Sequence, residues 1–175
     1  MNRCLLLTCI ALVFLLGPMA SPAFAGRIVA LGDLHGDLDA TRQALRLAGA
    51  IDETDHWVGG DLTVVQTGDQ LDRGDDEQAI LELLDRLQDE ARAAGGVLHL
   101  LNGNHELMNG RLDFRYITEG GFADFEDAVE IGERDSVMLA HDPAQQARVE
   151  AFRPGGPYAR LLAERPVVLV IDGNV

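Results

Sequence analysis

Three short polar clusters in the chain carry the residue types that bind metal ions and transfer protons. They are G-D-L-H-G-D at 32–37, G-D-Q-L-D-R-G at 68–74 and G-N-H-E at 103–106. Carboxylates, imidazoles and amide oxygens are ligands for metals such as manganese, iron and zinc, and imidazoles also transfer protons near neutral pH. Each cluster alone could be a capped turn or the polar start of a helix. Their joint occurrence predicts one site, and the flanking glycines let the backbone approach a ligand closely.

Each cluster directly follows a short apolar run that is typical of a buried strand. The expected strands are 27–31, 62–67 and 97–101, and the spacing of apolar residues predicts helices at 39–48 and 75–94. Strands that alternate with helices over short connections indicate a parallel α/β sheet with right-handed crossovers. Because the carboxyl ends of neighbouring parallel strands meet at one edge, the three clusters should lie together there.

The segment 107–165 is less regular, and it predicts a helical insertion or lid rather than core. Residues 122–131 and 143–152 favour acidic, exposed helices, and 157–164 favours a short helix with Pro157 in its first turn.

The end of the chain predicts a fourth strand. Val167–Ile171 is an apolar run, and the Asp172-Gly173 pair after it is typical of a hairpin turn. The return strand would begin at Val175. We therefore expect one domain over 26–175 that is incomplete at its C-terminus.

The first 25 residues have the pattern of a signal peptide. Arg3 is followed by an apolar stretch from Cys4 to Leu16, which is shorter than the roughly 20 residues of a spanning helix, and Ala23-Phe24-Ala25 fits a cleavage site. An uncleaved anchor is the alternative. Cleavage predicts an exported protein, periplasmic or secreted, with no stable membrane insertion. Both cysteines lie in this leader, so the mature chain would have no disulfide, thiolate nucleophile or cysteine-type zinc site.

The composition excludes several function classes. The chain has 29 acidic residues against 14 basic ones, and its formal net charge of −15 disfavours binding to nucleic acid. All the basic residues are arginine, and the absence of lysine excludes a P-loop lysine and Schiff-base chemistry.

Taken together, the clusters resemble the G-D-x-H-G, G-D-x-x-D-R-G and G-N-H-E signatures of calcineurin-like metallophosphoesterases, nearest to the phosphoprotein-phosphatase branch. The run N-H-E-L-M-N at 104–109, Arg115-Tyr116 and the segment 156–170 are similar to Shewanella-like protein phosphatases. The resemblance implies an α/β fold, namely the N-terminal part of the family's α/β/β/α sandwich. Residues 107–165 would then be a helical insertion between the third and fourth core strands.

The resemblance implies a centre of two divalent metal ions, manganese, iron or zinc. Asp33, His35, Asp69 and Asn104 match the family's metal ligands, with Asp69 bridging the two ions. Asp33 and His35 alternate along an extended segment, so both can reach one cation. Two further histidine ligands of the family would come after Val175, and we therefore expect one well-held ion in this chain.

The remaining cluster residues resemble the family's catalytic groups. His105 matches the general acid, Asp72 the carboxylate that orients it, and Arg73 with Asn104 the phosphate-binding groups. The implied reaction is the hydrolysis of phosphomonoesters, on a phosphorylated protein or a small molecule, by a metal-activated hydroxide. Asp37 and Glu106 are expected to support the loops.

Two alternatives stay open at this point. Without the later histidines, the chain could be an inactive remnant that binds a single metal. A dinucleoside polyphosphate hydrolase or phosphodiesterase could also use the same scaffold. The other histidines, His56, His99 and His141, match no motif. His99 is expected either in the core or in support of a metal ligand, and the other two in solvent.

Overall fold

The computed structural model describes residues 26–132, 134–171 and 173. The predicted signal peptide at 1–25 lies outside these residues, and so do Asp172, Asn174 and Val175 at the predicted terminal turn. The strands β1 (Ile28–Leu31), β2 (Thr63–Gln66) and β3 (Val97–Leu100) form a three-stranded parallel sheet in the order β1-β2-β3. The predicted strands and their parallel arrangement are therefore confirmed.

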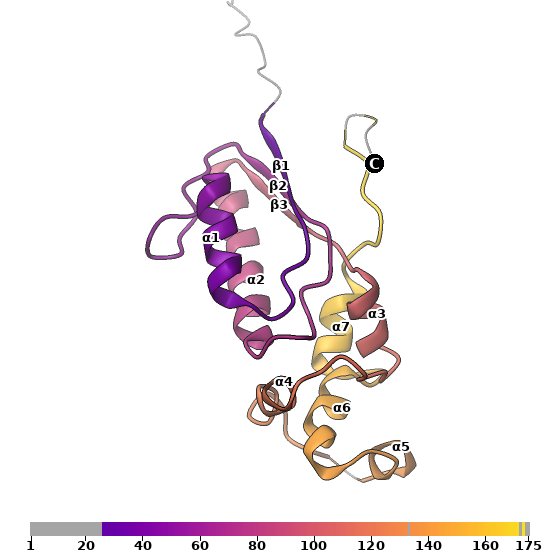
Figure 1. The fold of residues 1–175 in the computed structure, drawn as a ribbon. Coiled ribbons are helices and arrows are strands. Elements are labelled where there is room, and N and C mark those ends of the chain that lie inside the picture. The colour runs from indigo at the N-terminus through magenta and orange to yellow at the C-terminus, as the bar shows by residue number, and fades with distance from the viewer. Residues whose placement is uncertain (1–25, 133, 172, 174–175) are drawn as a thin grey trace, which may run out of the picture.

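Two helices make the crossovers, and Figure 1 shows both against the same face of the sheet. They are α1 (Leu38–Ala48) and α2 (Glu77–Ala94), and each ends at a glycine in the left-handed conformation. The Asp37 side chain caps α1 by accepting a hydrogen bond from the Ala40 N–H. The apolar stripes of both helices and the facing strand residues form one core that includes Leu45, Val64, Leu84, Leu87 and Leu98.

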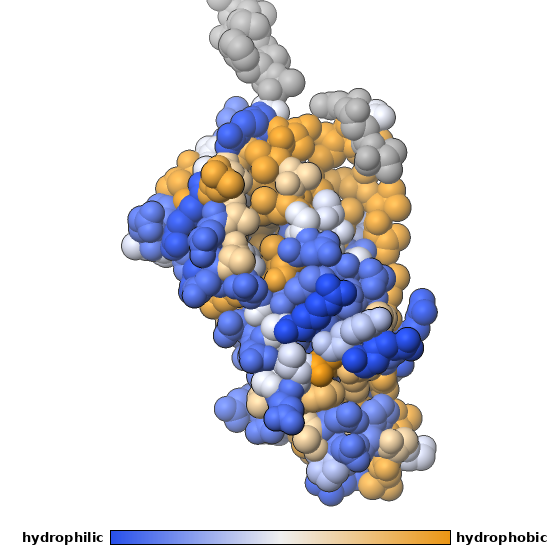
Figure 2. All heavy atoms as spheres, in the orientation of Figure 1, coloured by the Kyte–Doolittle hydropathy of each residue, from blue (hydrophilic) through white to orange (hydrophobic). Residues whose placement is uncertain are grey.

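The opposite face of the sheet is open and apolar. A groove on this face lies between sheet residues and the C-terminal segment, and it is lined by Ile28, Ala30, Val65, Thr67, Leu101, Val167, Val168, Leu169 and Ile171. Figure 2 shows the hydrophobic residues gathered over the strands and along that segment. Parallel sheets are normally covered on both faces, so this face exposes apolar surface that another layer of structure would usually bury.

The predicted fourth strand is wrong for the described residues. Residues 167–170 carry no strand, and Val167, Val168 and Val170 are 57–59% exposed. The segment is attached where the Asn102 N–H donates to the Pro166 carbonyl over 2.8 Å. An apolar run becomes a strand only when a neighbour completes its ladder, and this part of the chain lacks one.

The second half of the chain is helical. In chain order, its elements are α3 (Asn104–Asn109), α4 (Glu119–Ala123), α5 (Ser136–Leu139), the 3₁₀ turn η1 (Pro143–Gln145), α6 (Gln146–Phe152) and α7 (Pro157–Ala163). They enclose a second core around Phe125, Phe152 and Leu162. The aromatic rings of Phe125 and Phe152 meet edge to face with centroids 5.2 Å apart.

Two expectations for this half are corrected by the structure. Residues 143–152 were expected as an exposed helix, yet α6 is buried through Val149, Ala151 and Phe152, because α6 packs into the second core. Residues 122–131 were expected as a helix, yet α4 ends at Ala123. Asp124 then accepts a hydrogen bond from the Gln78 N–H over 2.7 Å, and this contact ties the chain to α2.

Candidate active site

The three clusters meet at the carboxyl ends of the strands, as the parallel order predicts. The first loop contacts the second through its backbone, where the Leu34 and His35 N–H groups donate to the Asp69 carbonyl over 2.9 and 3.0 Å. The Gly36 N–H donates to the Gln70 carbonyl over 2.9 Å. These main-chain bonds fix the loops without using the side chains that could do chemistry.

Two pairs of glycines allow this close approach. A Cβ atom on Gly36 would lie 2.7 Å from the Gly74 Cα, and one on Gly68 would lie 2.1 Å from the Gly103 nitrogen. Both distances are shorter than any real Cβ contact. The glycines of the motifs are therefore required where one loop backbone lies directly against the next.

Glu106 joins the second and third clusters from inside. Its buried carboxylate accepts hydrogen bonds from the N–H groups of Asp69 and Gln70, both at 2.8 Å, and of Leu71 at 3.2 Å. It also accepts one from the Gly103 N–H at 2.7 Å. The supporting function expected for Glu106 is thus confirmed.

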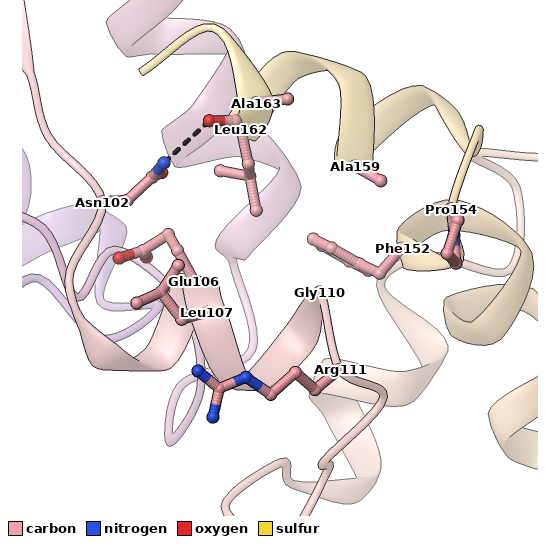
Figure 3. Close-up of a pocket in the computed structure, with 10 residues that line it drawn as sticks. All are labelled: Asn102, Glu106, Leu107, Gly110, Arg111, Phe152, Pro154, Ala159, Leu162 and Ala163. Carbon is pink, nitrogen blue, oxygen red and sulfur yellow. Dashed lines mark hydrogen bonds between the residues drawn. The ribbon is translucent and has the colours of Figure 1, made fainter. Parts of the chain in front are cut away.

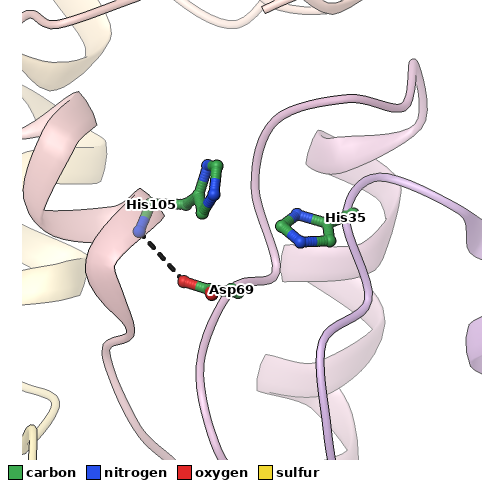
Figure 4. A group of neighbouring side chains, drawn as sticks. All are labelled: His35, Asp69 and His105. Atoms are coloured by element: carbon green, nitrogen blue, oxygen red, sulfur yellow. Dashed lines mark hydrogen bonds between the residues drawn. The ribbon is translucent and has the colours of Figure 1, made fainter. Parts of the chain in front are cut away.

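His35, Asp69 and His105 form a group whose potential ligand atoms all lie within 4.8 Å of one another (Figure 4). His35 Nδ1 lies 3.0 Å from the Leu71 carbonyl, which can only accept, so Nδ1 carries the proton. His35 Nε2 then has a free lone pair, and it is buried without a hydrogen-bond partner among the described residues. A buried imidazole nitrogen of this kind beside a carboxylate fits a divalent metal ion.

The other two predicted metal ligands lie at the edge of this group. The Asp33 side chain is 62% exposed, and its Oδ2 is 3.4 Å from His35 Nε2. Asn104 is exposed at the first position of α3, next to His105, whose N–H donates to Asp69 Oδ1 over 2.9 Å. The structure therefore brings His35 and Asp69 together and places Asp33 and Asn104 beside them.

His105 and Asp72 form a buried pair. Asp72 Oδ2 accepts from His105 Nδ1 over 2.7 Å, and both side chains are almost fully buried. The His105 Nε2 therefore faces the site, where it lies 3.3 Å from Nη2 of Arg73. Arg73 is exposed, and its guanidinium stacks 5.7 Å from the ring centre of Tyr116. The imidazole of His105 thus lies next to both the Arg73 guanidinium and the group of His35 and Asp69.

A cavity of about 540 Å³ opens beside these residues. Its lining includes Asp33, His35, Arg73, Asp75 and Thr118. It is large enough for a phosphate ester and its alcohol part. Because Arg73 and His35 both line this cavity, it is the candidate substrate site.

The backbone is strained at four residues of the site. His35, Asp69, Asp72 and Arg73 have φ angles of 47, 57, 69 and 71°, in the left-handed region that non-glycine residues seldom adopt. Such strain is typical of functional loops that the surrounding structure holds in place.

The sequence reasoning missed Arg148. This residue of α6 is fully buried, and its guanidinium contacts Glu77 of α2 and Asp72 of the second cluster. Burial raises the pKa of the Glu77 carboxyl to about 7, and Arg148 opposes this shift. A single basic residue among Ala147, Val149 and Phe152 was the available signal for a buried ion pair.

A second cavity, of about 310 Å³, lies between α3 and α7 and is mostly apolar (Figure 3). Figure 3 shows Asn102 at one side, where its Nδ2 donates to the Leu162 carbonyl over 2.7 Å.

Of the histidines outside the motifs, His56 is exposed and His99 and His141 are half-buried. Among the described residues, none of the three belongs to the group of His35, Asp69 and His105.

Comparison with known proteins agrees with this geometry. A family model for calcineurin-like phosphoesterases matches residues 26–170. The chain is 40% identical over 175 residues to Shewanella-like protein phosphatase 2 of Arabidopsis thaliana, covering 85% of this chain and 45% of the relative. It is 30% identical over 150 residues to Shewanella-like protein phosphatase 1 of Plasmodium berghei, covering 86% of this chain and 38% of the relative.

A solved structure is also similar. The crystal structure of the cold-active protein-tyrosine phosphatase of a psychrophilic Shewanella species superposes with a TM-score of 0.59 at 28% identity, over 80% of this chain and 39% of that one. The chain thus spans less than half the length of these relatives. Within the described residues, no helix has both the length and the apolar character needed to cross a membrane.

Proposed function

The chain belongs to the calcineurin-like phosphoesterase family, and from this premise we propose that it hydrolyses phosphomonoesters in a metal-dependent reaction. The substrate class is a phosphorylated protein or a small phosphomonoester. One observation carries the proposal: the unpartnered His35 Nε2 and the Asp69 carboxylate lie in one group with His105, beside Arg73.

His35 and Asp69 would hold the first divalent ion, with Asp33 completing its protein ligands from the edge of the site. Asp69 and Asn104 would contribute to a second ion. The nitrogen and oxygen donors suit manganese, iron or zinc. When bound, such ions lower the pKa of a water so that hydroxide is available near neutral pH, and they stabilise charge on phosphoryl oxygens.

Arg73 binds the phosphate in this proposal. Its guanidinium is exposed to the cavity and is steadied by the Tyr116 ring, and its planar fork can donate two parallel hydrogen bonds to phosphate oxygens. Its place beside His105 Nε2 directs the ester oxygen of the substrate toward that imidazole. Asn104, at the start of α3, adds an amide to the same edge.

His105 is the general acid of the proposed reaction. Asp72 holds Nδ1 and orients the ring, so that Nε2 can deliver a proton to the departing alcohol oxygen.

A substrate panel tests the function. The full chain is freed of metal with a chelator, reloaded with Mn²⁺, and assayed on p-nitrophenyl phosphate, phosphotyrosine and phosphoserine peptides, bis-p-nitrophenyl phosphate and dinucleoside polyphosphates. We expect turnover of the monoesters and its loss on chelation. Preference for the diester or the dinucleotides would replace the proposed function, and metal binding without any turnover would favour the non-catalytic alternative.

Matched variants sharpen this test. Asp69→Asn should lower turnover by about 10²-fold or more and weaken metal retention, because it removes a carboxylate from the metal group. Asp61→Asn, which changes an exposed carboxylate away from the loops, is the control and should leave both unchanged. Arg73→Ala should weaken phosphate binding while the chain keeps its metal.

We also propose that the protein is exported to the periplasm or secreted. The support is the sequence pattern of residues 1–25. Expression of the full chain in a bacterial host should give a mature protein that begins at Gly26 and fractionates outside the cytoplasm. A cytoplasmic product that retains Met1 would contradict this proposal.

A further inference from the structure

Arg148 reaches from α6 into the interior, toward the carboxylate that holds His105. Its guanidinium is fully buried, and its Nη2 donates to Glu77 Oε2 over 2.5 Å and to Asp72 Oδ1 over 3.3 Å. Its Nη1 donates to Glu77 Oε1 over 3.1 Å. The guanidinium therefore makes a bidentate ion pair with Glu77, and this pair places Nη2 next to Asp72.

The remaining donors of Arg148 are also used. Nε donates to Asn109 Oδ1 over 2.9 Å, and Nη1 donates to the Gly121 carbonyl over 2.8 Å. The rings of Phe125 and Phe152 lie 4.7 and 5.1 Å from the guanidinium carbon and exclude water from it. Hydrogen bonds at all three nitrogens and the two ring contacts thus hold the Arg148 side chain in a single conformation.

These contacts fix both oxygens of Asp72. Oδ1 accepts from Arg148 and from Asn109 Nδ2, the latter over 2.8 Å, and Oδ2 accepts from His105 Nδ1 over 2.7 Å. Asn109 Nδ2 also donates to the His105 carbonyl over 3.0 Å. The carboxylate has no rotational freedom left, and the His105 ring takes its orientation from it.

We propose that Arg148 is a positioning residue for catalysis: paired with Glu77, it holds Asp72 in the rotamer that orients His105 Nε2 toward Arg73 and the group of His35 and Asp69. This inference rests on the proposed function, in which His105 is the general acid. The helical segment then contributes to the reaction from its interior, although none of α6 touches the substrate cavity.

The physical reason is charge balance in a buried space. Asp72 and Glu77 are both fully buried, and Arg148 is the cation that they share. Without it, both buried carboxylates would lose their shared cationic partner, a costly change. Asp72 would then rotate toward Asn109, and His105 Nδ1 would lose its anionic acceptor.

The test uses the double variant Arg148→Met/Glu77→Gln, which removes the cation together with its paired carboxylate so that the fold survives. Arg153→Met is the control, because Arg153 follows directly after α6 but pairs with the partly exposed Asp135 and Glu150. Both are prepared as the full chain and compared with the wild type and with Arg148→Met alone.

The first readout is the Nδ1 proton of His105, observed by NMR in protein with isotopically labelled histidine. It is assigned by its absence in His105→Gln. A short bond to a carboxylate moves such a proton far downfield, and we expect this signal in the wild type and in Arg153→Met. Its shift or loss in the double variant supports the proposal, and an unchanged signal overturns it.

The second readout is turnover of aryl phosphates with leaving groups of graded acidity. If His105 is misplaced, the double variant should lose about 10²-fold in kcat on phenyl phosphate but far less on dinitrophenyl phosphate, whose departing oxygen needs no proton. Equal losses on both substrates would indicate a merely structural effect and overturn the proposal. Absence of turnover in the wild type would contradict the proposed function, while the His105 signal would still decide the positioning of the ring.

Discussion

The two halves of the molecule contribute to the site in different ways. The sheet and its two helices position the loops through main-chain hydrogen bonds and glycine contacts, such as the approach of Gly68 to Gly103. The helical half acts through buried side chains, and Arg148 is the main one. Backbone contacts between the loops bring the polar side chains together. The orientation of the His105 ring depends in addition on buried ion pairs that the helical half supplies.

The largest change in stability is expected from a substitution that tests whether the two halves unfold together. Phe152→Ala removes a fully buried ring from the second core and should lower the free energy of unfolding by about 3–5 kcal/mol. The measurement is fluorescence of Trp57, the single tryptophan of the chain, which lies in the first core. Because Arg148 and Glu77 join the halves, the Trp57 transition should move to lower denaturant.

Leu84→Ala in the first core is the matched change for this experiment. It should lower the free energy of unfolding, measured from the same Trp57 fluorescence transition, by about 2–5 kcal/mol. If the denaturant midpoint of the Trp57 transition falls in Leu84→Ala but is unchanged in Phe152→Ala, the helical half unfolds independently of the sheet, and the expected coupling is contradicted.

An intermediate effect is expected at the glycine contacts of the loops. Gly68→Ala places a methyl group against the Gly103 backbone and should cost about 2–4 kcal/mol, with weaker metal binding. Gly60→Ala also has a positive φ but has open space around it, so strain alone should cost about 1 kcal/mol. Calorimetry and metal titration of both variants measure the difference, and equal losses would contradict a specific loop contact.

The smallest effect concerns the protonation of Glu77 at the boundary of the halves. Burial raises its pKa from 4.5 to about 7, so the folded protein binds the proton more tightly than the unfolded chain does. The stability from this group is present below pH 4.5 and is lost as the pH rises through 7. Relative to Glu77→Gln, the wild type should lose on the order of 1–3 kcal/mol over this range in urea titrations. A constant difference would contradict a raised pKa.

The sequence allowed the sheet and the convergence of its loops to be predicted, because both depend on local patterns. Apolar runs, short connections and glycines near Asp33, Asp69 and His105 contain that information. Arg148 could not be placed in this way, since its partners Glu77 and Asp72 lie 71 and 76 residues away along the chain. The apolar run at 167–170 was misjudged for a related reason: a strand needs a partner that its own residues do not specify.

The left-handed backbone at His35, Asp69, Asp72 and Arg73 has a consequence for how this protein can be improved. Strain at such positions costs of the order of 1–3 kcal/mol each, so a glycine or asparagine there would relax the loop and raise thermal tolerance. The same exchange would remove a reactive group. Directed evolution for heat resistance should therefore select changes at residues that the proposed reaction needs, and stability and activity would have to be screened together.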